Sequence, residues 1–136
     1  MRARDASALL LIVLLSSAYA AICPAAECDF SRGSCTATSG NATVTLDITP
    51  KPVRSMRELF FTVTVKGARI QAPLLLVLTM PGMYMGRNEV VMKQVQDGSF
   101  AGRGIIPRCP TGKNLWQADI AIPGGGSASY RFHVDH

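Results

Sequence analysis

The sequence predicts an all-β protein: a single seven-stranded antiparallel β-sandwich of immunoglobulin-like type behind an N-terminal signal segment. Three observations support this prediction. Apolar residues alternate with polar ones in several short runs, turn-forming residues separate these runs at regular spacing, and no segment shows the apolar period of an amphipathic helix. The length of 136 residues suits one domain once the signal segment is removed.

Residues 1–20 have the three parts of a secretory signal peptide. Arg2 and Arg4 give a positive start, Ala8–Leu15 is an unbroken apolar run, and Ala18–Ala20 fits the small-x-small cleavage rule. We therefore expect the mature, exported chain to begin at Ala21 and to work in the periplasm or outside the cell.

Two alternatives remain open for this segment. An uncleaved anchor is one, although the apolar run is shorter than the ~20 residues that a spanning helix needs. A lipoprotein is the other, with Cys23 acylated, although Ile22 stands where such sites want a small residue. Membrane contact is therefore expected only through an uncleaved signal.

Four cysteines in an exported chain favour disulfides over reduced thiols. Three of them, Cys23, Cys28 and Cys35, fall within residues 21–41, an arm rich in Cys, Ala, Ser and Gly that we expect to be irregular. Cys28 and Cys35 bracket the turn-forming Ser31–Gly33, so a local bridge between these two is our first choice. Cys109 is then free or paired with Cys23.

The sandwich domain is expected over residues 42–136. Its strands are predicted at residues 43–49, 59–66, 74–79, 88–96, 99–106 and 115–122, with a last one around residues 130–134. The third run is continuously apolar, which is typical of a strand covered on both faces. The alternation in the other runs predicts buried side chains, among them Phe61, Val63, Met92, Trp116, Ile120, Tyr130 and Phe132.

Glycines mark two further features of the strand region. Asp97-Gly98 predicts a tight two-residue hairpin. Gly102 and Gly104, inside a predicted strand, indicate a bulge or a close backbone approach.

The charge distribution and the motifs of the sequence argue against two functional classes, nucleic-acid-binding proteins and enzymes. The 14 Lys and Arg residues against 9 Asp and Glu are scattered, without basic runs or interleaved aromatic residues, so nucleic acid is not an expected partner and the charge suggests solubility. No Ser/His/Asp or Cys/His arrangement has a supporting motif. The glycines at 124–126 join two strands, whereas a phosphate loop precedes a helix. We expect a protein that is not an enzyme.

The least ordinary segment is the loop predicted at residues 80–86, Met-Pro-Gly-Met-Tyr-Met-Gly. Thioether sulfur is a soft, uncharged ligand that suits Cu(I), and Met80, Met83 and Met85 are three donors on one turn. The alternative is that these methionines cap the core as adaptable filler.

Strand direction would bring further donors to the same end of the sandwich. In an antiparallel sandwich of seven strands, the connections after the first, third and fifth strands share one pole. The residues brought there would be Met56, Cys109, His133 and the terminal His136. The candidate metal ligands are therefore Met80, Met83, Met85, Met56, Cys109 and His136.

The segment from Thr43 to Val134 resembles the small periplasmic YtkA-like and FixH-like domains. The resemblance rests on the residues 50–56 before a Phe-Thr-Val strand, on the methionine segment 80–88, on residues 106–112 around Cys109, and on Trp116. It implies a β-sandwich and a role in copper binding or copper delivery. Many copper-handling sandwiches have a histidine in or next to such a methionine loop, and this chain has none there, which favours Cu(I) over Cu(II).

Three functional hypotheses follow from the sequence. The first is an exported copper-binding protein that stores Cu(I) or hands it to another exported or membrane protein. The second is a metal-free interaction module that docks through its methionine-rich pole. The third is a redox-responsive protein that works through Cys109.

Overall fold

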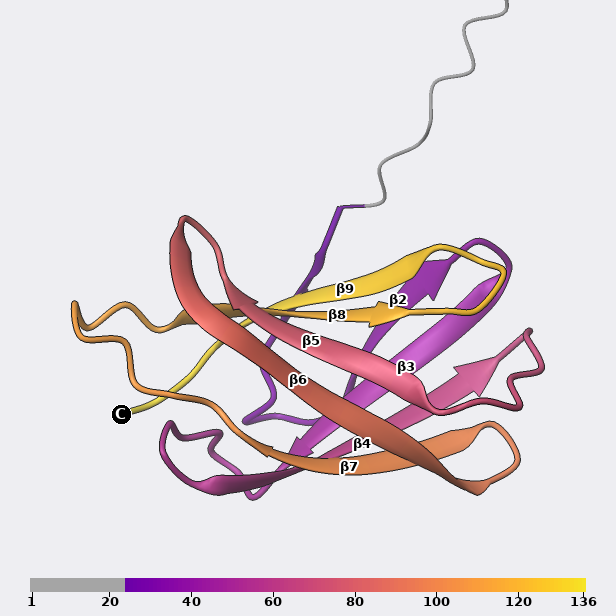
Figure 1. Cartoon of the computed structure of the whole chain (residues 1–136), viewed down its shortest axis with the longest axis horizontal. Helices are drawn as coiled ribbons and strands as arrows, with labels where there is room; N and C mark the ends of the chain where they lie inside the picture. Colours follow the sequence, from indigo (N-terminus) through magenta and orange to yellow (C-terminus); the bar gives the residue numbers. More distant parts are fainter. Residues whose placement is uncertain (1–23) are drawn as a thin grey trace, which may run out of the picture.

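The computed structural model describes residues 24–136, so the predicted signal peptide lies outside the described residues. The described chain is all-β, which confirms the predicted class, and it forms nine strands (Figure 1). They are β1 (Ala26–Cys28), β2 (Cys35–Ser39), β3 (Ala42–Thr49), β4 (Glu58–Lys66), β5 (Leu74–Met80), β6 (Met83–Gln96), β7 (Ser99–Ile105), β8 (Leu115–Ala121) and β9 (Ser127–His133). No helix long and apolar enough to span a bilayer occurs among these residues.

The strands form one sheet that curls almost into a barrel, so the prediction of a seven-stranded immunoglobulin-like sandwich is wrong. The strand order is β1-β9-β8-β5-β6-β7-β4-β3-β2. Strand β6 is 14 residues long, and it pairs with β5 along its earlier part and with β7 at Lys93–Gln96. Strand β6 therefore joins the strands on the β5 side of the sheet to those on the β7 side, and its diagonal path is seen in Figure 1.

Two glycines of β7 allow β6 to cross so closely. A Cβ atom built at Gly102 would lie 2.7 Å from a methyl group of Val90, and one built at Gly104 would lie 2.6 Å from the other methyl group of the same residue. Any larger residue would push β6 away from β7. The predicted close backbone approach is thus confirmed, and so is the Asp97-Gly98 hairpin between β6 and β7.

The N-terminal arm is part of the sheet, which corrects the prediction of an irregular segment. Strand β1 pairs in parallel with β9, and β2 pairs antiparallel with β3. The predicted disulfide between Cys28 and Cys35 is confirmed, with Cα atoms 5.8 Å apart. Because β1 and β2 are the two ends of the strand order, this bridge covalently joins the edges of the sheet.

A single apolar core fills the curled sheet. The predicted inward residues are buried, including the large side chains of Phe61, Met92, Trp116, Tyr130 and Phe132. The Tyr130 hydroxyl donates a hydrogen bond to the Val44 carbonyl oxygen at 2.7 Å, across the line where β9 faces β3. Polar tyrosine hydroxyls need such a partner when they are buried.

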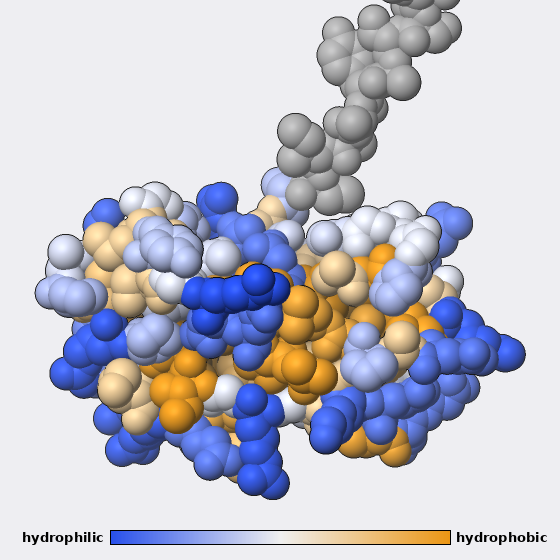
Figure 2. Space-filling model, viewed as in Figure 1, coloured by the Kyte–Doolittle hydropathy of each residue, from blue (hydrophilic) through white to orange (hydrophobic). Residues whose placement is uncertain are grey.

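The outer face of β5 differs from the prediction, because only one face of this strand is covered. Leu74, Leu76 and Leu78 are buried, whereas Leu75 keeps 37% of its surface exposed. Leu75 lies opposite Val91 on β6, which is 56% exposed. Figure 2 shows apolar residues gathered in the middle of this face, where Figure 1 places β5 and β6.

Candidate functional site

Four segments meet at one end of the molecule, here called the sulfur pole and defined as residues 50–57, 80–87, 106–114 and 134–136. Backbone hydrogen bonds tie residues 50–57 to residues 106–114 and 134–136, and a side-chain contact between Cys109 and Met83 joins residues 80–87 to them. The Ser55 N–H donates to the Asp135 carbonyl at 2.8 Å, and the Met56 N–H donates to the Ile106 carbonyl at 2.8 Å. In Figure 1 this is the left-hand end, which holds the C-terminus and the β5–β6 hairpin.

The predicted methionine loop is a hairpin, so most of its residues lie in strands. Only Pro81 and Gly82 form the turn, and Gly82 has the positive φ of 77° that a type II turn requires at its second central position. Met80 ends β5 and pairs with Met83, the first residue of β6. Paired residues place their side chains on the same face of a sheet.

The methionine side chains of the hairpin point towards the apolar core. Met80 is buried at 4% exposure, and Met83 and Met85 are partly buried and pack against the core. Tyr84, between them, points outward with 88% of its surface exposed. The alternation of a strand, which the loop interpretation did not include, thus puts three thioethers on the inner face.

Cys109 is the chemical centre of this arrangement. Within residues 24–136 its thiol forms no disulfide, and it is buried at 2% exposure. The predicted alternative partner, Cys23, lies outside the described residues. The Cys109 Sγ lies 3.3 Å from the Met83 Sδ and 3.1 Å from the Thr111 Oγ1. The structure therefore brings one thiol and one thioether from distant parts of the sequence into direct contact.

The surroundings of Cys109 favour the thiolate form. The hydrogen bond from the Thr111 hydroxyl, those from the Thr111 and Lys113 backbone amides and the Lys113 charge together lower the pKa of the Cys109 thiol below its ordinary value, against the opposing effect of desolvation. Thiolate is the form of cysteine that binds metals and attacks electrophiles.

We predict that Thr111→Val raises the pKa of Cys109. Valine has nearly the shape of threonine but lacks the hydroxyl, which is the largest single cause of the lowered pKa. The residue-specific measurement is a pH titration of the Cys109 ¹³Cβ chemical shift by NMR. An unchanged midpoint would show that the hydroxyl does not stabilise the thiolate, and Thr38→Val on the outer face of β2 serves as a control.

Met56 reaches the sulfur pole in an unusual conformation. Among residues 24–136 it is the non-glycine residue with a positive φ, at 61°, and its side chain is 64% exposed. A left-handed backbone conformation is costly for residues other than glycine and asparagine. The hydrogen bond from the Met56 N–H to the Ile106 carbonyl helps to hold Met56 in this conformation. Its thioether is thus presented to solvent and is not part of the buried set.

The two histidines do not join the sulfur atoms. His136 Nδ1 lies 3.4 Å from the Ser55 hydroxyl, and its Nε2 lies 3.3 Å from the Gly112 carbonyl oxygen, so both ring nitrogens have polar neighbours already. His133 lies 3.1 Å from the Asn114 side chain. Within the described part of the chain no three His, Cys, Asp or Glu side chains group as metal ligands, so a metal here would need thioethers.

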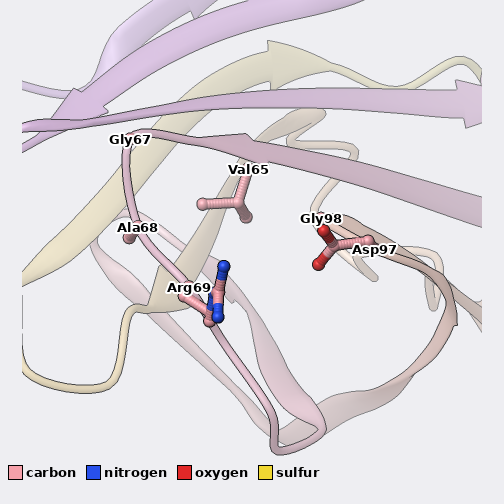
Figure 3. A pocket seen from close by; sticks show the side chains of 6 residues that line it. All are labelled: Val65, Gly67, Ala68, Arg69, Asp97 and Gly98. Carbon is pink, nitrogen blue, oxygen red and sulfur yellow. The ribbon is translucent and has the colours of Figure 1, made fainter.

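Sequence reasoning missed a hollow at the opposite end of the molecule. It has a volume of about 360 Å³ and is lined by Val65, Gly67, Ala68, Arg69, Asp97 and Gly98. Figure 3 shows the Arg69 and Asp97 side chains extending into the space between the β4–β5 connection and the β6–β7 hairpin. Little in the sequence indicated this hollow, because Arg69 and Asp97 lie in turns, where charged side chains usually face solvent.

Three other hollows are smaller. One of about 320 Å³ lies between the β2–β3 and β8–β9 turns. One of about 310 Å³ lies over β4 and β7, and one of about 130 Å³ lies between Asp29, Pro52 and His133. None of the four is lined by Cys109 or by the hairpin methionines.

The fold and the site define the chain as a small all-β protein with a buried thiol–thioether pair at one end of a nearly closed sheet. Comparison with known proteins found no matching family model, no matching characterised protein and no matching solved structure. The resemblance to YtkA-like and FixH-like domains therefore stays a prediction.

Proposed function

We propose that this protein binds Cu(I) at the sulfur pole and stores it or hands it to another exported protein. The observation that carries the proposal is the contact between Cys109 and Met83, with Met80 and Met85 on the same inner face. A thiolate supplies the charge that balances Cu(I), and thioethers supply soft neutral ligands that hard cations ignore. The disulfide between Cys28 and Cys35 suits an oxidising compartment outside the cytoplasm.

The spacing of the sulfur pair suits a shared metal after a small adjustment. Two ligands with metal–sulfur bonds of about 2.3 Å at tetrahedral angles lie about 3.8 Å apart. The observed separation of Cys109 Sγ and Met83 Sδ is 3.3 Å. The two atoms would have to move apart by about half an ångström, which a methionine with three rotatable side-chain bonds accommodates.

The ligands have different roles in this proposal. Cys109 and Met83 form the centre, and Met80 and Met85 complete the set from the same hairpin. Met56 is exposed, so it suits a transient contact with Cu(I) as the ion enters or leaves the site. His136 is held by Ser55 and Gly112 and is the weakest member of the predicted set.

The test is an anaerobic Cu(I) titration of the whole exported protein against a competing chelator. We expect one Cu(I) per chain, weak Zn(II) binding, and an affinity at least roughly tenfold lower in the double variant Met83→Leu/Met85→Leu, since even outer-shell changes act on that scale. Leucine keeps the volume, so each change should cost less than about 1.5 kcal/mol of stability.

Met92→Leu is the matched control. Met92 is fully buried in the middle of β6, and its replacement tests the same chemical change away from the sulfur pole. Equal Cu(I) affinity of the wild type, the double variant and the control would reject the copper proposal.

That same result would favour the second hypothesis, a metal-free interaction module. The exposed side chains of Tyr84 and Met56, at 88% and 64%, are the observation behind it. Tyrosine and methionine are both enriched in protein interfaces.

A further inference from the structure

The sulfur pole has a second property that does not depend on copper, which is its charge. Its four segments contain six Lys or Arg residues and one acidic residue, Asp135. The rest of residues 24–136 contains six Lys or Arg and seven acidic residues. Cations that are scattered along the sequence are therefore collected by the fold at one end.

Most of these cations are available for an external partner. All six are exposed: Lys51, Arg54, Arg57, Arg87, Arg108 and Lys113. Lys51 forms an ion pair with Asp47 and Arg87 forms one with Glu89, each at 2.6 Å. Arg54, Arg57, Arg108 and Lys113 form no ion pair with any residue in the described range.

Apolar and aromatic side chains project from the same end. Tyr84 stands out from the β5–β6 hairpin and Met56 from the β3–β4 connection. In Figure 2, tan apolar residues and blue hydrophilic ones adjoin at the end that holds this hairpin. Tyrosine suits the boundary between water and lipid, because its ring is apolar and its hydroxyl is polar.

The projecting side chains of this end suit a planar membrane surface. The hollow of about 130 Å³ at this end is lined by Pro52, Val53 and Asp135 of the sulfur pole, and the projecting Tyr84, Met56 and four unpaired cations lie outside it. Protruding side chains with basic neighbours match a planar anionic surface, into which they insert without a complementary cavity.

We propose that the sulfur pole docks the protein on the surface of a membrane that contains anionic lipid. The unpaired cations lie near the lipid headgroups, and Tyr84 and Met56 enter the headgroup layer. Each cation close to such a surface strengthens association about fivefold, and the attraction decays within a Debye length, so binding depends on salt.

The test uses the whole exported protein without metal and follows its co-sedimentation with vesicles. Vesicles of equal parts phosphatidylglycerol and phosphatidylcholine are compared with vesicles of phosphatidylcholine alone. We expect binding to the anionic vesicles that weakens in high salt, and little binding to the neutral ones. Arg57→Glu/Arg108→Glu should reduce the affinity at least about tenfold.

Lys66→Glu/Arg69→Glu is the matched control, because it makes the same charge change at exposed sites of the opposite end. It should reduce the affinity less than the pole variant does. Equal loss in the two variants, equal binding to neutral vesicles, or no binding to anionic vesicles would each overturn the proposal. Far-UV circular dichroism checks that both variants are folded, and none of these readouts depends on Cu(I).

Discussion

Replacing Trp116 by alanine is expected to lower the free energy of unfolding by about 3–5 kcal/mol, the range for a large aromatic side chain removed from a core. Trp116 is 1% exposed and stands on β8, the strand between β5 and β9. Its removal would leave a cavity bounded by strands that the continuous sheet prevents from collapsing.

Urea denaturation followed by far-UV circular dichroism measures this loss. Trp116 is the only tryptophan in the chain, so fluorescence would lose its probe in the variant. Tyr84→Ala is the control, since Tyr84 is 88% exposed and its replacement should change stability by no more than about 0.5 kcal/mol. A loss below about 1 kcal/mol for Trp116→Ala would contradict the placement of this side chain in the core.

Removing the disulfide by Cys28→Ala/Cys35→Ala is expected to cost about 2.5 kcal/mol. The cysteines are separated by 7 positions. The chain-entropy relation for a loop of that size gives about this value, because the bridge limits the freedom of the unfolded chain. Thermal or denaturant unfolding measures the difference.

Reduction of the wild-type protein should produce the same loss as the double variant. A loss of stability markedly larger than about 2.5 kcal/mol would mean that the bridge also maintains packing in the folded state. One such contact is that of Phe30 with Phe132, whose ring centroids lie 5.1 Å apart in an edge-on arrangement. No loss at all would mean that β1 and β2 are held by packing alone.

The regular strands could be predicted because one face of each is buried. Val44, Leu46 and Ile48 on β3, like Trp116, Ala118 and Ile120 on β8, alternate with polar residues and all lie in the core. A period of two is the direct consequence of a strand with one covered face. These elements needed no tertiary information.

The curling of the sheet towards a barrel could not be predicted, because it depends on contacts between distant segments. The arm has no large apolar residues in β1 and β2, and its strands form by pairing with β9 and β3. The first residues of β6 contain glycine and two methionines, a composition that resembles a loop. Only the pairing of Met83 with Met80 places them in a strand.

The candidate site was predictable in part. Strand direction indicated that the connections holding Met56, the hairpin methionines and Cys109 share one end, and the structure places them there. The direct contact between Cys109 and Met83 depends on side-chain packing that strand direction does not specify, and so does the outward position of Met56. The collection of cations was also hidden, because Arg57 and Arg108 are 51 positions apart in a sequence without basic runs.

The pairing of β1 with β9 has a consequence for how the chain acquires its shape. Ala26 lies beside Tyr130, so the first strand of the described chain has its partner only when the last strand has been made. Contacts of such high sequence separation slow folding and leave edges open until late. A chain that is synthesised or translocated from its N-terminus therefore cannot finish this sheet in stages. Its edges stay unpaired until β9 has emerged.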